Sequence, residues 1–93
     1  MPDSFGDALQ NFLQKLYREK SKWESVLSAW EQVASEFKNY AWPSLWRRGV
    51  LVVEVQDSNW LYFFNFKKQE LIEKLNELLP PENKIQEIRL RVR

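Results

Sequence analysis

The order of apolar and polar residues predicts that the chain opens with two helices. Apolar side chains recur at intervals of three and four residues, which predicts amphipathic helices over about 4–20 and 21–39. We place a break at Lys20–Ser21, because Ser21 and Glu24 have the spacing of a capping box, which is typical of a helix start. The apolar stripe of the first helix comprises Phe5, Ala8, Leu9, Phe12, Leu13 and Leu16, and that of the second comprises Trp23, Val26, Leu27, Trp30, Val33, Ala34 and Phe37.

A β-hairpin is predicted over about 42–56. Residues 50–55 are mostly β-branched, which favours a strand, and Gly49 supplies the turn before them. With a three-residue loop, Leu45 lies opposite Leu51 and faces the core together with Val53 and Val55. Trp42, Trp46, Val50, Val52 and Glu54 then share the other face, whereas a two-residue loop would reverse the first strand.

The rest of the chain predicts a helix and a closing strand. Asp57 and Ser58 cap a helix over about 58–79, which ends at two prolines, and residues 85–92 alternate as a strand does. The predicted order is α-α-β-β-α-β. This order indicates an α+β domain of two layers, with helices on one face of a small three-stranded mixed sheet. We expect residues 1–93 to form a single domain without a flexible tail.

Composition removes most catalytic chemistry. The chain has no His and no Cys, which excludes disulfides, cysteine nucleophiles and zinc sites built on these residues, and its two glycines cannot supply a phosphate-binding loop. Its carboxylates lie on polar helix faces, and no Ser or Lys has an activating neighbour. We therefore expect no enzyme activity, no catalytic residues, no metal and no cofactor. No membrane span or signal peptide is evident, so a cytoplasmic location is expected.

Two groups of residues predict binding to nucleic acid. Arg89, Arg91 and Arg93 alternate on the closing strand and so project from one face, about 6.6 Å apart. Trp42 and Trp46 are predicted to share that face, and indole rings beside guanidinium groups can hold single-stranded nucleic acid. Two alternatives remain: the arginines protect a sheet edge, or the first helix covers the tryptophans. Two turn residues extend the proposed surface: Arg47 and Arg48.

The predicted helix at 58–79 carries more aromatic residues than one face can bury. Leu61 and Phe64 match its apolar stripe, whereas other aromatic side chains near them exceed it. Such a surplus is typical of a wide core, a dimer interface or a site for a partner protein. The residues that we assign to partner contact are Trp60, Tyr62, Phe63 and Phe66.

Several short motifs, in this order and spacing, resemble the DciA family of bacterial replicative-helicase loaders. They lie in segments 29–34, 43–55, 57–64, 71–76 and 85–91. The resemblance implies a KH-like domain that contacts a DnaB-type hexameric helicase and binds single-stranded DNA. It also implies that Trp30 anchors the core, that Gly49 makes the hairpin turn, and that Trp60 is the leading candidate for a helicase contact.

Two departures from the family pattern qualify this expectation. Ala34 stands where the family usually has glycine, which changes local helix packing. Many members also carry a flexible basic extension that this chain lacks, so we expect weak to moderate DNA affinity. The predicted function is that of an adaptor in replication initiation that helps to load the helicase. The alternatives are a KH-like RNA-binding module and a structural homodimer formed through the first helix and the surplus aromatics.

Overall fold

The computed structural model describes residues 2–93, with side chains from residue 6 onward. It contains α1 (Pro2–Val33), β1 (Ala41–Arg47), β2 (Val50–Val55), α2 (Ser58–Leu78) and β3 (Glu87–Val92), in the order α-β-β-α-β. Two short 3-10 turns, η1 (Ser35–Phe37) and η2 (Pro81–Asn83), follow the two helices. The α+β class and the three-stranded mixed sheet are confirmed, and they agree with the arrangement that the resemblance implies.

The predicted break at Lys20–Ser21 is wrong, because α1 is one helix of 32 residues. No proline interrupts its hydrogen bonds there, and Lys20 pairs with Glu24 across the predicted break at 4.0 Å. The apolar stripe also stays in phase, so that the stripe of the first half continues into that of the second. The helix ends at Val33 rather than near residue 39, and η1 occupies part of the remaining segment.

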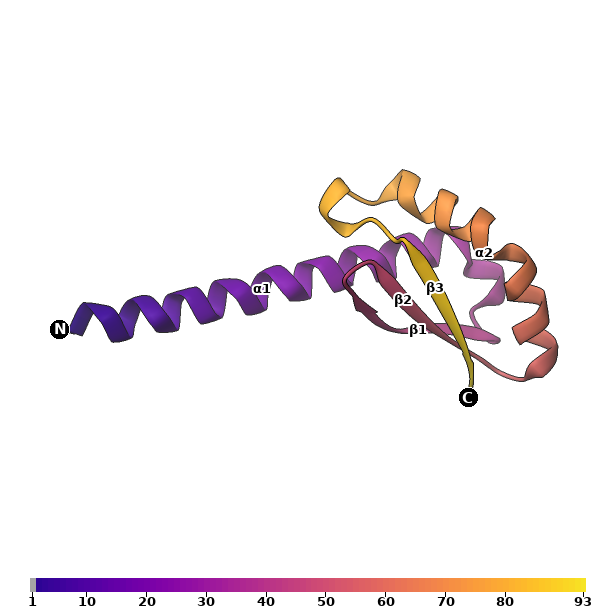
Figure 1. Cartoon of the computed structure of the whole chain (residues 1–93), viewed down its shortest axis with the longest axis horizontal. Helices are drawn as coiled ribbons and strands as arrows, with labels where there is room; N and C mark the ends of the chain where they lie inside the picture. The colour runs from indigo at the N-terminus through magenta and orange to yellow at the C-terminus, as the bar shows by residue number, and fades with distance from the viewer. Residues whose placement is uncertain (1) are drawn as a thin grey trace.

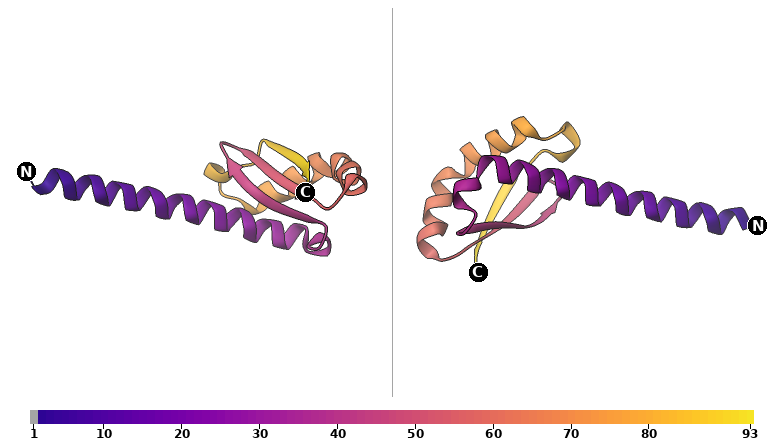
Figure 2. Two further views of the ribbon diagram at one scale, coloured as in Figure 1. Left: turned by 90° about the horizontal axis from the view of Figure 1, so that it is seen from below. Right: turned by 180° about the vertical axis from the view of Figure 1, so that it is seen from behind.

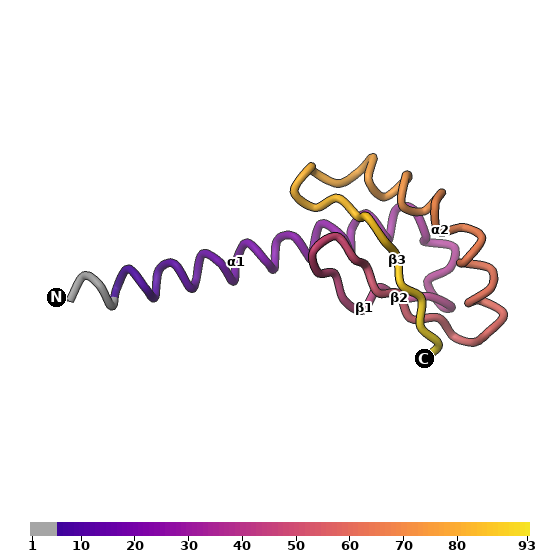
Figure 3. Tube along the Cα trace, viewed as in Figure 1, coloured from indigo at the N-terminus to yellow at the C-terminus, as the bar shows by residue number. Residues whose placement is uncertain are grey.

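Only the second half of α1 belongs to the packed domain. Figure 1 shows the first half projecting away from the sheet, and the molecule measures 59 × 27 × 19 Å. All side chains from Gly6 to Ser21 are exposed. The C-terminus lies at the end of β3 beside the sheet, far from the projecting half of α1 (Figure 3).

The core lies between the sheet and the two helices (Figure 2). Trp30, predicted as a core anchor, is buried, and it packs in one cluster with Phe64 of α2 and Ile88 of β3. The Asp57 side chain accepts a hydrogen bond from the Trp60 amide at 3.2 Å, which confirms the predicted cap of α2. Asn76 holds the segment after α2 against the helix. Its side-chain oxygen accepts a hydrogen bond from the Ile85 N–H at 2.7 Å, and its side-chain nitrogen donates one to the Ile85 C=O at 2.9 Å.

The sheet order is β1-β2-β3, with β1 and β2 antiparallel and β2 and β3 parallel. The predicted pairing of Leu45 with Leu51 is wrong: Leu45 pairs with Val52, and Trp46 pairs with Leu51. The hairpin turn has two residues instead of three, which shifts the register by one residue. The side chains of Leu45 and Trp46 therefore lie on the faces of the sheet opposite to those predicted. A bulge between Pro43 and Leu45 shifts the register back, so Trp42 at the start of the strand pairs with Glu54 and lies on the predicted face.

Candidate binding surfaces

The hairpin turn places two arginines at one end of the sheet. Arg48 and Gly49 both have left-handed backbone angles, with φ of 52° and 83°. Two successive left-handed residues are what a tight two-residue turn between antiparallel strands requires. Arg47 is the last residue of β1, so the turn exposes Arg47 and Arg48 side by side.

The register separates the two tryptophans that were predicted to share a face. Trp42 pairs with Glu54 on the open face of the sheet, as predicted. Trp46, by contrast, pairs with the buried Leu51 and packs against the core, so its predicted position is wrong. Its indole Nε1 is buried and has no hydrogen-bond acceptor among the described residues.

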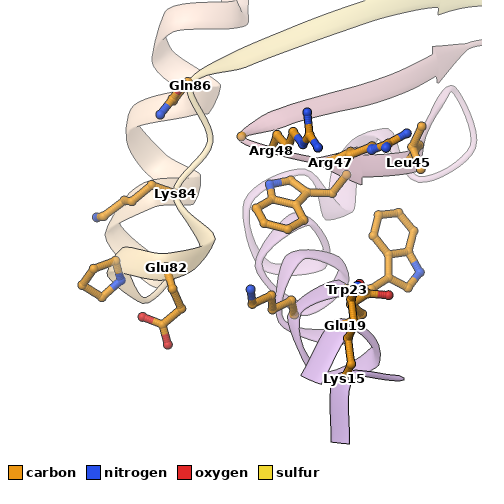
Figure 4. Close-up of a pocket in the computed structure, with 13 residues that line it drawn as sticks. Lys15, Glu19, Trp23, Leu45, Arg47, Arg48, Glu82, Lys84 and Gln86 are labelled. Atoms are coloured by element: carbon orange, nitrogen blue, oxygen red, sulfur yellow. The ribbon is translucent and has the colours of Figure 1, made fainter. Parts of the chain in front are cut away.

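A groove of about 790 Å³ lies between α1, the hairpin turn and the segment around η2 (Figure 4). Two indole rings, of Trp23 and Trp46, line it. Cationic side chains on its walls outnumber acidic ones by five to two. The cations are Lys15, Lys22, Arg47, Arg48 and Lys84, and the acids are Glu19 and Glu82. The groove therefore combines positive charge with aromatic surface.

Sequence reasoning identified only part of this groove. Trp46, Arg47 and Arg48 were assigned to nucleic acid, and they do lie together. Lys15, Lys22, Trp23 and Lys84 were not assigned, because they come from α1 and from the segment after α2 and meet the hairpin only in the folded chain. An unbroken reading of the stripe from Leu9 to Trp30 would have joined Lys15 to Lys22 and Trp23 on one helix, but no sequence signal sets this helix beside the hairpin.

The open face of the sheet carries the predicted row of arginines. Arg89 and Arg91 project from this face, as does Trp42 from β1. Arg91 bonds the Glu54 carboxylate at 2.9 Å, and Arg89 bonds that of Glu87 at 3.3 Å. Arg93 lies 5.1 Å from the centre of the Trp42 ring, within cation–π range. This face therefore offers less uncompensated charge than the groove.

The aromatic residues at the start of α2 divide into a packed group and an exposed pair. Trp60 is half-buried and stacks on Tyr40, with ring centres 4.3 Å apart. Phe63 is also half-buried and packs on Phe37 at 5.3 Å. Tyr62 and Phe66 are exposed at 67% and 88% and lie one turn apart on the same side of α2. Of the four residues assigned to partner contact, this pair is the most accessible.

Charged residues follow the aromatic group along α2. Glu70 accepts contacts from Lys74 at 3.0 Å and Lys67 at 3.5 Å. The hydrogen bond from Lys74, together with the charges of both lysines, lowers the pKa of the Glu70 carboxyl. A lowered pKa stabilises the fold at neutral pH, and this contribution is lost as pH falls through that pKa.

The described residues contain no metal site and no candidate membrane span. No group of three or more acidic, His or Cys side chains lies close enough there to hold a metal ion. Neither helix has a stretch long and apolar enough, in the part of the chain described, to cross a bilayer.

Comparison with known families decides the identity of the domain. The family model described as "Dna[CI] antecedent, DciA" matches residues 4–90, nearly the whole chain. The chain belongs to the DciA family. Membership implies a role in loading the DnaB helicase during replication initiation, as a non-enzymatic helicase operator. A search of curated proteins finds no match.

The match to the family model includes the projecting half of α1. Since the match to DciA starts at Ser4, the exposed first half of α1 lies inside the family domain rather than beside it. The groove and the aromatic start of α2 lie inside it as well.

Proposed function

We propose that this DciA-family chain couples a DnaB-type helicase to single-stranded DNA, and that the DNA binds first in the basic groove. The observation that carries the proposal is the juxtaposition of five cations and two indole rings on the walls of one groove. Backbone phosphates pair with Lys and Arg, and unpaired bases stack on aromatic rings.

The charge of the groove is available to a ligand. The ion pairs of the described residues involve Lys20, Lys67, Lys74, Arg89 and Arg91, none of which lines the groove. The arginines of the open face are partly neutralised by acidic neighbours. An approaching phosphate therefore meets stronger positive potential at the groove.

The open sheet face extends the proposed DNA surface. Arg47 connects the two regions, because it lines the groove and also pairs with Val50 at the end of the sheet. Beyond it, Trp42, Arg89, Arg91 and Arg93 provide a second set of contacts on the open face, with Trp42 offering a ring for stacking.

The helicase is proposed to dock at the aromatic start of α2. Tyr62 and Phe66 expose most of their rings there, whereas the Trp60 and Phe63 rings pack against each other with centres 5.5 Å apart. Exposed aromatic pairs of this kind act as anchors in protein interfaces. β2 runs from the hairpin turn to α2, so the two proposed sites lie at opposite ends of the sheet (Figure 1). Both partners can then bind at once.

DNA binding in the groove is tested with Arg48→Asn. Asparagine tolerates the left-handed backbone at this position, so the variant removes charge while preserving the turn. We expect affinity for a fluorescein-labelled oligothymidylate to fall severalfold by anisotropy. Loss of one phosphate contact should also reduce the slope of log affinity against log salt by about 0.7. Lys38→Gln, which removes an exposed cation outside the groove, is the matched control and should leave both quantities unchanged.

Two results would contradict this assignment. Equal binding by Arg48→Asn and the parent chain would remove the groove from the DNA surface. If Arg89→Ala with Arg91→Ala then weakened binding, the open face would be the primary site. Tighter binding to oligouridylate than to oligothymidylate would favour the RNA-binding alternative.

A further inference from the structure

The projecting half of α1 exposes an apolar stripe that no part of the described chain covers. Leu9, Phe12, Leu13 and Leu16 lie on one side of the helix, and each has at least 40% of its surface exposed. Four large apolar side chains on the exposed half of a helix are a marked departure from a solvated helix face. The stripe is therefore expected to be covered by another molecule in solution.

We propose that a second copy of this chain covers the stripe, with the two α1 helices antiparallel. An interface between identical copies related by a two-fold axis must be self-complementary. The spacing of the stripe meets this condition, because positions 9, 12, 13 and 16 are symmetric about the midpoint between residues 12 and 13. An antiparallel pair centred there sets Leu9 against Leu16 of the second copy. Phe12 and Leu13 each pack beside their own symmetry mates.

The charges along α1 favour the same arrangement. Residues 1–14 contain two aspartates and no Lys or Arg, whereas residues 15–22 contain four cations and one glutamate. Antiparallel helices centred between residues 12 and 13 bring the acidic segment of each copy alongside the basic segment of the other. A parallel pair would align basic with basic and would be repelled. A second copy therefore matches this stripe both in the spacing of its apolar residues and in the distribution of its charges.

The free half of α1 is long enough for such a contact. Residues 6–21 extend for about 24 Å at the rise of an α-helix, and they protrude clear of the sheet (Figure 2). The two domains of the dimer would then lie at opposite ends of the paired helices. The aromatic start of α2 and the open sheet face would stay uncovered, whereas the acidic segment of the second copy would lie near Lys15 and Lys22 of the groove, so dimer formation and DNA binding in the groove would compete for these two cations.

Engineered cysteines test the register, because the natural chain has none. Leu13→Cys should form a disulfide-linked dimer under mild oxidation, since its symmetry mate lies across the contact. Leu9→Cys should cross-link with Leu16→Cys when the two variants are mixed. It should link poorly with itself, because residues 9 of the two copies are offset by about 10 Å along the helices. Gln14→Cys, on the far side of the helix, is the matched control and should not cross-link.

The mass of the cysteine-free protein tests the interaction itself. Light scattering should show a monomer–dimer equilibrium, and Leu13→Glu should raise its dissociation constant at least about tenfold by placing a charge in the apolar contact. Gln14→Glu should leave the constant unchanged. A monomer mass at all concentrations up to hundreds of micromolar would overturn the proposal. Self-linking of Leu9→Cys, as parallel helices require, would also overturn it.

These measurements use neither DNA nor helicase. A negative result would therefore exclude the dimer without bearing on the proposed function in DNA and helicase binding. A complex with the helicase that Leu13→Glu abolishes, together with a strictly monomeric free chain, would assign the stripe to the helicase and refute the second copy as its occupant.

Discussion

At the scale of single residues, similar side chains have different roles because their surroundings differ. Trp60 carries the resemblance to the DciA family, yet its ring is packed among Tyr40, Phe63 and Phe64. Phe66 lies six positions further along α2 and is almost fully exposed. Burial, rather than residue type, separates a stabilising aromatic from one that is free to bind.

This difference leads to a prediction for two substitutions in α2. Trp60→Ala should destabilise the domain by about 2 kcal/mol, because it removes a half-buried ring from the cluster. Phe66→Ser should change stability by less than about 0.5 kcal/mol, as expected for an exposed site. Urea denaturation followed by far-ultraviolet circular dichroism measures both. In co-elution with the helicase, Phe66→Ser should weaken the complex, and undiminished co-elution would exclude Phe66 from the interface.

The two glycines respond to substitution in opposite ways. Gly49→Ala should destabilise the domain by about 1–2 kcal/mol, because φ is 83° and the new methyl group would lie 3.2 Å from Gln86. Gly6→Ala has no atom within 4 Å of the new methyl group and favours the helix, so it should raise helicity without cost to the domain. Thermal melts report both effects. An equal melting temperature for Gly49→Ala and the parent chain would contradict the left-handed turn.

At the scale of elements, α1 consists of two halves with different support. From Trp23 onward it packs on the core, whereas every side chain of residues 6–21 is exposed and none belongs to the core cluster. An isolated helix of this length is marginal in water. The free half should therefore open locally far more often than the rest of the chain.

Hydrogen exchange measures this contrast. At low protein concentration, amides of residues 6–20 should exchange within seconds to minutes, and those of residues 71–79 should be protected by orders of magnitude more. Protection of residues 6–20 should rise with concentration if dimer formation covers them. Equal protection of the two segments at every concentration would show that the free half is supported within one chain.

Elements with strong local signals were predictable from the sequence, and long-range geometry was not. The Asp57 cap and the β-branched run at 50–55 located α2 and β2 correctly. The register of the hairpin depends on Arg48 adopting a left-handed conformation and on a bulge near Ser44, and neither has a clear sequence signal. The capping box at Ser21 is real as a pattern, but it stabilises a helix start only where the preceding turn unwinds.

At the scale of the whole molecule, the binding surfaces are spread along one axis. The groove lies at the base of the projecting helix, and the aromatic start of α2 lies at the other end of the sheet. The sequence identified the aromatic excess and the arginine row, because both are local patterns. It could not place the groove, whose walls come from residues 15–23, 45–49 and 81–86 and meet only in the folded chain.

The bulge in β1 also bears on how copies of this chain can associate. A three-stranded open sheet has two free edges, and a regular free edge recruits strands from other molecules. In β1, Pro43 lacks an N–H group and the adjacent bulge disrupts the regular spacing of donors and acceptors. The other edge, β3, carries alternating charged side chains. Both edges thus resist strand addition, so the fold discourages fibrous growth and directs association of this chain to its helices.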